Sequence, residues 1–456
     1  MNKEQQIKIT FLGAAGTVTG SKHLLETPTK KILIDCGLFQ GLKELRLLNW
    51  QPLPIDVSTI DHVILTHGHL DHVGYLPLLI KQGFKGKIYA TEPTVEIAKL
   101  ILLDSAKIQE EDAERANRFN YSKHKPAKPL YDTKEAEAVF PFFESKPLNS
   151  WTDINNDISF QFKYNGHILG ACFIELKIKN KTIVFSGDIG RIDDPLMYET
   201  EYPETADVIV MESTYGNRSH SDDAKQLLAD EINKAESKQG TIIIPSFAVE
   251  RTQLIMFLLW QLANEKKIPT MPIYMDSPMG THVLEVFHKN LKWHKLSLAE
   301  SKEICSQIKI IKNESETEKI IRDKTPKIII ASSGMATGGR VLSYFEKYIG
   351  DPKATILLAG YQGEGTRGRS LLDGAKEIKM RGKFWKVNAT ISLIEGLSAH
   401  ADQKELINWI SKLKKAPEKI FIVHGEKAGA EGLQNKMKEK YGYKSTIPLL
   451  NQTFEI

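Results

Sequence analysis

The chain has 456 residues, of which 41% are apolar and 26% are charged, and its formal net charge is +4. This composition indicates a globular protein of about two to three domains, and the mild positive charge permits a polyanionic partner without predicting one. Three widely spaced cysteines argue against a disulfide framework, and without an apolar leader or a bilayer-length segment we expect a cytoplasmic protein with no membrane contact.

An early apolar run, 63–65, leads directly into a candidate metal site. After Thr66 the chain reads His67-Gly68-His69-Leu70-Asp71-His72. A strand that ends here presents the first two imidazoles together, and the glycine between them lets the backbone bend around an ion. Imidazole nitrogen and carboxylate oxygen suit divalent zinc, and an open coordination position can activate water. The alternative is a solvated turn that happens to be rich in histidine.

The hydrophobic pattern of the predicted strands, here called strand style, changes along the chain. Segments 158–164 and 173–179 alternate apolar and polar residues, as antiparallel strands with one buried face do. From Val208 onward, continuous apolar runs are separated by helix-length segments, which favours a parallel sheet covered on both faces. The sequence therefore predicts an α/β protein with a domain boundary near residue 210.

Polar residues follow several predicted strands. They are Asp35, His67, Asp188, Glu212 and His424. Ligands bind at the carboxyl ends of strands in layered α/β folds, so one pocket could collect all five side chains.

Two metal ions would need more ligands than the first motif supplies. His167 lies in a glycine-flanked turn between two alternating strands, where a lone histidine is normally polar surface but here fits a ligand role. Asp188 lies between Gly187 and Gly190, from where a carboxylate could bridge two cations, although Gly-Asp is also common turn chemistry. His424 ends another strand and would complete the second site.

Together these motifs resemble the β-CASP branch of the metallo-β-lactamase fold nucleases, which includes the cleavage nuclease of mRNA 3′-end processing. The resemblance covers essentially the whole chain. Asp35, the motif at residues 67–72, His167 and Asp188 match the four motifs of the fold in order. The motifs that distinguish the branch match Glu212, His400 and His424 as motifs A, B and C.

The resemblance implies a dinuclear centre with two Zn²⁺ per chain. His67, His69 and His167 would hold one zinc, and Asp71, His72 and His424 the other. Asp188 would bridge them, and Asp35 would orient a ligand histidine by accepting its other ring proton.

The resemblance also implies an architecture. A four-layered αββα metallo-β-lactamase domain, residues 1–214, would be interrupted by an inserted α/β β-CASP domain of mainly parallel sheet, residues 215–389. The chain would then return to the first domain as residues 390–456. The change of strand style near residue 210 agrees with this division.

The expected chemistry is phosphodiester hydrolysis, with endonuclease or exonuclease action. A metal-bridging hydroxide would attack phosphorus and leave 5′-phosphate and 3′-hydroxyl ends. Asp71 and Asp188 would take part as metal-bound carboxylates. His400 paired with Glu212 could be held as imidazolium, to neutralise the transition state or to protonate the departing oxygen.

RNA, in single-stranded form, is the expected partner, because a histidine at motif C resembles the RNA-acting members of the family. Glycine-rich turns of the inserted domain could cradle its phosphates, through Ser333, Gly338, Gly339 and Arg340. Ser246 and Arg251 also resemble a family motif that faces the cleft. The alternatives are ordinary turns for the glycines and a structural ion pair for Arg251.

Two further segments allow more than one interpretation. The basic stretch 115–128 could follow a phosphate backbone, or it could be a solvated linker. The terminal segment 447–456 is apolar enough to cover a partner surface, as in a homodimer.

Three rival functions stay open. A glyoxalase-like thioesterase, a lactamase or another ester hydrolase would use the same first motif, His167 and Asp188, but would not need an insertion bounded by Glu212 and His400. A DNA nuclease of the resembled family would typically carry valine at motif C, where this chain has His424. A non-cutting RNA-binding scaffold would carry replaced ligands, and here every ligand position is filled.

Overall fold

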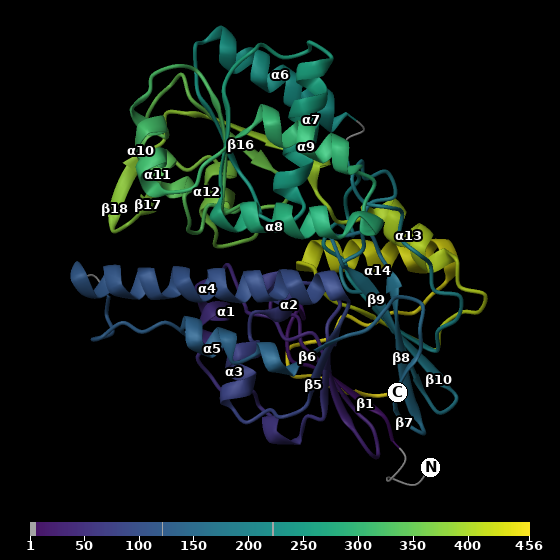
Figure 1. Ribbon diagram of the computed structural model, residues 1–456. Coiled ribbons are helices and arrows are strands. Elements are labelled where there is room, and N and C mark those ends of the chain that lie inside the picture. Colours follow the sequence, from purple (N-terminus) through teal and green to yellow (C-terminus); the bar gives the residue numbers. More distant parts are fainter. Residues whose placement is uncertain (1–5, 121, 221–222) are drawn as a thin grey trace. The chain divides into compact units, whose positions relative to one another are not determined.

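The computed structural model describes residues 6–120, 122–220 and 223–456 (Figure 1). The chain forms two compact units, the first up to Ser219 and again from Ala399, the second between His220 and Ser398. These divisions lie a few residues beyond the predicted boundaries at 214/215 and 389/390. Strand β19 (Thr390–Ile394) explains the later return, because it pairs with β16 in the sheet of the second unit.

The first unit contains two sheets. The seven-stranded sheet has the order β21-β1-β2-β3-β4-β5-β6, and the six-stranded sheet has the order β20-β11-β10-β9-β8-β7. The strands of the first sheet are β1 (Lys8–Phe11), β2 (His23–Glu26), β3 (Lys31–Ile34), β4 (His62–Ile64), β5 (Lys87–Ala90), β6 (Phe143–Ser145) and β21 (Thr453–Glu455). Those of the second are β7 (Thr152–Asn155), β8 (Ile158–Tyr164), β9 (Cys172–Ile178), β10 (Lys181–Phe185), β11 (Val208–Met211) and β20 (Lys419–Ile422).

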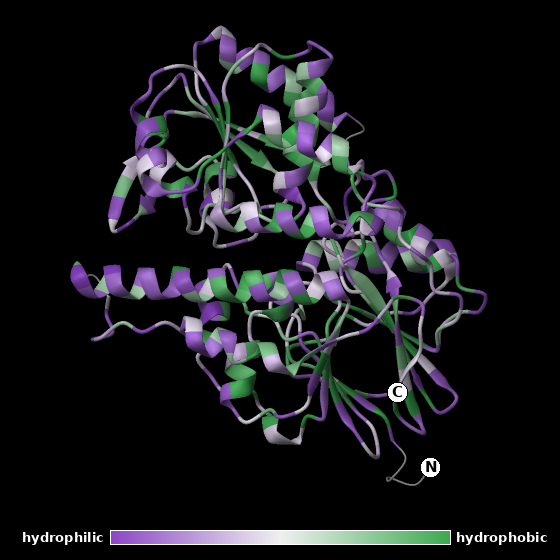
Figure 2. Ribbon diagram, in the orientation of Figure 1, coloured by the Kyte–Doolittle hydropathy of each residue, from purple (hydrophilic) through white to green (hydrophobic). Residues whose placement is uncertain are grey.

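A single apolar core joins the two sheets. Phe11 and Ile34 of the first sheet belong to the same buried cluster as Phe160, Ile174 and Phe185 of the second. Strands β8 and β9 pair antiparallel, as their alternating pattern predicts. The strands appear largely hydrophobic in Figure 2.

Helices cover the outer faces of the sheets. Trp409 and Leu433, on the C-terminal helices, are buried in one cluster with Val184 and Ile209 of the second sheet. Figure 1 shows α3, α4 and α5 beside β5 and β6 of the first sheet. The helices of this unit are α1 (Lys43–Leu48), α2 (Leu70–Val73), α3 (Leu76–Lys81), α4 (Glu92–Arg118), α5 (Thr133–Glu137), α13 (Gln403–Ser411) and α14 (Lys427–Tyr441).

The change of strand style begins one strand before the inserted domain. The apolar run that begins at Val208 has the continuous pattern of a parallel sheet, and the boundary after residue 214 leaves it in the first domain. It is β11 of the first unit, which pairs in parallel with β10 and β20. A strand with parallel neighbours on both sides and both faces buried has the same sequence pattern in either unit.

The second unit is built on an all-parallel sheet with the order β14-β13-β15-β12-β16-β19. Its other strands are β12 (Ile242–Pro245), β13 (Ile273–Asp276), β14 (Lys309–Ile310), β15 (Ile328–Ala331) and β16 (Thr355–Ala359), with a hairpin of β17 (Glu377–Met380) and β18 (Lys383–Lys386). Its helices are α6 (Ala224–Ser237), α7 (Arg251–Asn264), α8 (Pro278–Lys289), α9 (Leu298–Gln307), α10 (Glu314–Arg322), α11 (Val341–Tyr348) and α12 (Arg367–Leu372). The α/β class, the two-sheet first domain and the mainly parallel sheet of the insertion are therefore as predicted.

The terminal segment forms an edge strand of the first sheet. Strand β21 pairs antiparallel with β1, and Phe454 packs against the core between the sheets. Leu449 and Leu450 just before it are exposed. In the described part of the chain, no helix has the length and apolar character needed to cross a membrane.

A buried histidine in the first sheet makes the fold sensitive to acid. His23 is 3% exposed and lies between the rings of Phe11 and Phe185. Burial, together with the nearby His72, His424 and Lys22, lowers its pKa to about 3. The unfolded chain binds a proton at this residue below about pH 6.5, whereas the folded chain does not until about pH 3, so stability falls as the pH drops through 6.5.

We therefore expect His23→Phe to lose less stability than the wild type on acidification. Between pH 7 and pH 5 the unfolding free energy of the wild type should fall by about 2 kcal/mol more than that of the variant. Urea unfolding with a chelator present measures this shift, and His282→Gln, a change at an exposed histidine of α8, is the control. Equal losses in the wild type and in His23→Phe would contradict the expectation.

Candidate metal centre

Strand ends of both sheets bring the predicted ligands together. Strand β4 leads into residues 67–72, and in the other sheet β8, β10 and β20 run in one direction and lead into His167, Asp188 and His424. The backbone N–H of Cys172 donates to the carbonyl of Thr66 at 3.0 Å and joins the two edges. The ligands therefore meet where the carboxyl ends of the two sheets touch.

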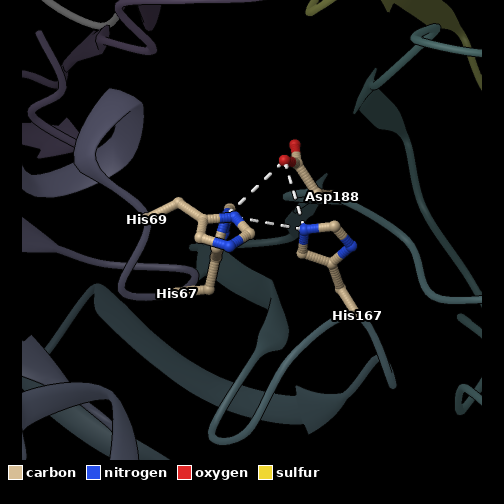
Figure 3. Close-up of side chains that lie close together, drawn as sticks. All are labelled: His67, His69, His167 and Asp188. Atoms are coloured by element: carbon tan, nitrogen blue, oxygen red, sulfur yellow. Dashed lines mark hydrogen bonds and ion pairs between the residues drawn. The ribbon is translucent and has the colours of Figure 1, made fainter. Parts of the chain in front are cut away.

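The first ligand group consists of His67, His69 and His167, with Asp188 beside them (Figure 3). His69 Nδ1 lies 3.1 Å from His67 Nε2 and 3.3 Å from His167 Nε2. Asp188 Oδ2 lies 3.5 Å and 3.7 Å from the Nε2 atoms of His67 and His167. Three ring nitrogens and one carboxylate oxygen thus face a common point.

The second ligand group consists of Asp71, His72 and His424. His72 Nε2 and His424 Nε2 lie 3.2 Å apart, and Asp71 Oδ2 lies 3.4 Å from His424 Nε2. Residues 352 positions apart in the chain thereby come into contact, because β20 is added to the second sheet beside β11.

Asp188 faces both groups with different oxygens. Its Oδ2 points to the first group, whereas its Oδ1 lies 3.4 Å from His72 Nε2 and 3.5 Å from His424 Nδ1. Oδ1 is buried and has no hydrogen-bond partner. The loop approaches very closely here, since a Cβ on Gly187 would lie 2.7 Å from Cβ of Thr66.

The protonation pattern of the site suits a cation. Burial lowers the pKa of His69 to about 4 and the pKa values of His67 and His167 well below the ordinary value, so these rings are neutral. Burial also opposes charge on His72, but the carboxylates of Asp188 and Asp35 outweigh it and raise the pKa. A proton on His72 therefore occupies the negative potential that a metal ion would otherwise occupy.

The spacing of the donor atoms also fits a metal ion. Nitrogen ligands lie about 2.0–2.1 Å from a tetrahedral zinc, so two of them are about 3.3 Å apart. The nitrogen pairs of the two ligand groups are 3.1–3.3 Å apart. Neutral nitrogens this close repel each other unless a proton or a cation lies between them, and two cations would also satisfy Asp188 Oδ1.

Asp35 lies directly behind the second ligand group. Its Oδ2 is 2.8 Å from His72 Nδ1 and accepts the hydroxyl of Thr66, and its Oδ1 accepts the N–H of Thr66. This position is the one required of a carboxylate that fixes a ligand imidazole with Nε2 toward a metal.

Two supporting residues have no separate signal in the sequence. Asn165 donates to the carbonyls of Ser186 and Asp188 and ties the bridging loop to the turn of His167. The hydroxyl of Thr214 lies 3.1 Å from His424 Nδ1. Both residues adjoin predicted motifs, but an isolated Asn or Thr beside a strand end is ordinary turn chemistry.

Glu212 and His400 form the predicted pair. Glu212 is buried, and its Oε1 lies 3.3 Å from His400 Nδ1 and accepts the N–H of Ile189 at 2.6 Å. Glu212 and His400 also gather with Asp188, so the pair adjoins the first ligand group. His400 is partly accessible, since 17% of its side chain is exposed.

In the second unit, Ser246 and Arg251 are buried at the carboxyl end of β12. Arg251 donates to the carbonyl of Ala359 at 3.2 Å, and its Nη2 lies 3.6 Å from Glu250. The hydroxyl of Ser246 is bonded to Thr252. Both side chains thus have partners within the second unit.

The predicted phosphate loop follows β15 in the same unit. The hydroxyl of Ser333 accepts the N–H groups of Thr337 and Gly338, and Gly339 has a positive φ of 73°. Arg340 donates to the hydroxyl of Thr317 at 3.2 Å. The loop is a compact turn that closes on the hydroxyl of Ser333.

Three known families match successive parts of the chain. Residues 16–244 match the metallo-beta-lactamase superfamily, residues 252–371 the Beta-Casp domain and residues 385–448 the Zn-dependent metallo-hydrolase RNA specificity domain. The first match alone covers half of the chain. The chain belongs to the metallo-β-lactamase superfamily, in its β-CASP branch.

Individual relatives of this β-CASP protein agree with the assignment. A ribonuclease of Thermus thermophilus is 30% identical over 92% of this chain and 93% of its own length. Transcription termination factor FttA of Methanosarcina mazei is 31% identical over 96% of this chain and 70% of its own length. A solved structure of an Enterococcus faecalis protein of unknown function shares the fold over 99% of this chain, with a TM-score of 0.54 at 14% identity.

We expect Asp35→Asn to weaken metal binding by about 10- to 100-fold, because His72 would lose the carboxylate that orients it. Competition with a chromophoric Zn²⁺ chelator measures the affinity. Asp61→Asn is the matched control, because Asp61 also accepts a backbone N–H, from Lys31, and lies outside the ligand groups. Unchanged Zn²⁺ affinity in Asp35→Asn would rule out this role.

Proposed function

We propose that this β-CASP protein is a zinc-dependent ribonuclease that hydrolyses RNA phosphodiester bonds and leaves 5′-phosphate and 3′-hydroxyl ends. The observation that carries the proposal is the position of Asp188, whose two carboxylate oxygens face two separate ligand groups. A site of this kind suits two metal ions, which is an arrangement used for phosphodiester hydrolysis.

The first and second ligand groups would each hold one zinc, with Asp188 between them. Zinc ions bound there would supply a hydroxide nucleophile near neutral pH and neutralise charge on the phosphoryl oxygens. Asp35 keeps His72 oriented by accepting its Nδ1 proton, and Asn165 holds the bridging loop in place.

His400 is the residue that we assign to proton transfer. Its Nδ1 faces Glu212, and the carboxylate of that residue is fixed by the N–H groups of Ile189 and Thr214. Glu212 thus orients the ring, and we assign to Nε2 the protonation of the departing 3′ oxygen of the RNA.

The substrate is assigned from the family. The match to an RNA specificity domain and the ribonuclease among the relatives support RNA, and so does the histidine at motif C, His424. Within the second unit, we propose that Ser333, Gly338, Gly339 and Arg340 contact phosphates of a single strand. Ser246 and Arg251, which are buried at the carboxyl end of β12, would hold the same edge of the sheet in place.

The proposal is tested with RNA labelled separately at the 5′ and the 3′ end. We expect cleavage by the zinc-loaded protein, products with 5′-phosphate and 3′-hydroxyl ends, and loss of activity after exhaustive chelation that added Zn²⁺ restores. A single-stranded DNA of the same sequence and a thioester substrate serve as controls. Cleavage that survives chelation, or hydrolysis of the thioester alone, would refute the proposal.

We expect His400→Ala to retain zinc and to lose turnover by about 100- to 10,000-fold, because only proton transfer is removed. Asp188→Ala should lose both the metal and the activity. Zinc content by elemental analysis and single-turnover cleavage distinguish the two outcomes, with His282→Ala as the control. A near-normal rate in His400→Ala would show that another group moves the proton.

A further inference from the structure

Helix α1, which follows the loop of Asp35, exposes apolar and basic side chains together. It has no buried residue. Leu47 is 48% exposed, and Trp50, just beyond the helix, is 58% exposed. Lys43, Leu47 and Trp50 follow one another at intervals of four and three residues, so they share one face of the turn, and Arg46 adjoins it. We call Lys43, Arg46, Leu47 and Trp50 the α1 surface.

The two cations of the α1 surface are available to a ligand. Lys43 and Arg46 are exposed, and within the described residues neither forms an ion pair. Some surface lysines of the same unit are instead paired, as Lys30 is with Asp61 and Lys81 with Glu135. The α1 surface therefore offers positive charge beside an exposed indole, and charge complementarity favours a polyanion.

The α1 surface is held firmly against the metal centre's own loops. The Asn49 side chain both donates to the carbonyl of Phe39 and accepts its N–H, at 2.8 and 3.0 Å. The N–H of Leu38 donates to the carbonyl of Leu70, at the start of the ligand helix α2. Behind this loop the buried ammonium of Lys22 donates to the carbonyl of Gly37 at 2.6 Å. A polyanion bound at the α1 surface would therefore have a fixed position relative to the second ligand group.

We propose that the α1 surface binds single-stranded RNA, with a base stacked on Trp50 and Leu47 and phosphates paired with Lys43 and Arg46. This inference rests on the proposed function and adds a binding site to it. Every base has a face that can stack on an indole, and a flanking cation neutralises the adjoining phosphate, so the pairing suits a single strand without sequence preference.

The test measures binding of a fluorescein-labelled 12-nucleotide oligoadenylate to metal-free protein by anisotropy. We expect Trp50→Ala to raise the Kd about tenfold and Trp50→Phe to restore most of the affinity. Trp151→Ala is the matched control, because Trp151 is also exposed and carries the ammonium of Lys177 at 3.9 Å from its ring. That variant should bind like the wild type.

Salt dependence separates the two kinds of contact. Arg46→Gln should reduce the slope of log Kd against log salt concentration by about 0.7, the value for one phosphate contact to a single strand. Trp50→Ala should leave this slope unchanged while it weakens binding at every salt concentration. Identical slopes and affinities in all variants would overturn the proposal.

Activity measurements distinguish failure of the site from failure of the proposed function. With zinc present, Trp50→Ala should raise the KM for RNA and leave hydrolysis of bis(p-nitrophenyl) phosphate unchanged. If the wild type cleaves RNA and Trp50→Ala behaves like Trp151→Ala, the α1 site is overturned and the ribonuclease stands. If RNA binding depends on Trp50 but no variant cleaves RNA, the α1 site stands and the ribonuclease fails.

A change of solution mass in Trp50→Ala without a change in RNA affinity would instead assign the surface to contact between copies of the chain, and would overturn the proposal.

Discussion

The structure of the first unit depends on one electrostatic constraint, the concentration of lone pairs and negative charge around Asp188. Its two oxygens and the nitrogens of five histidines lie in a buried place where an uncompensated charge is costly. Burial opposes charge on His72 and His424, but the carboxylates around them outweigh it and raise the pKa values of both rings. The rest of the first unit positions these groups, and it does so from both sheets at once.

The candidate ligands could be predicted from the sequence better than the residues that support them. Residues 67–72 combine three histidines and an aspartate within one turn, so a metal-binding motif could be predicted there from the local sequence alone. His167 and Asp188 could be predicted because each follows a strand and adjoins glycine. Thr66 and Asn165 could not, since each bonds to a loop that is distant in the chain and is brought near only by the assembly of its own sheet.

Fold prediction succeeded where hydrophobic patterning decides the outcome. Alternation identified β8 and β9 as antiparallel, and continuous apolar runs identified the parallel sheet of the second unit. Patterning could not assign β11 to its unit, because its partners β10 and β20 lie on opposite sides of it in the chain. Membership of a sheet is a long-range property, and the apolar pattern of one strand does not encode it.

The place of His424 in the chain has a consequence for synthesis. The ribosome must translate the whole inserted unit before β20 emerges and can dock beside β11. Until then the second ligand group lacks a member, and the edge of β11 has no neighbour. The candidate metal centre of a nascent chain therefore stays incomplete until the inserted unit has been translated, so the order of translation delays its assembly.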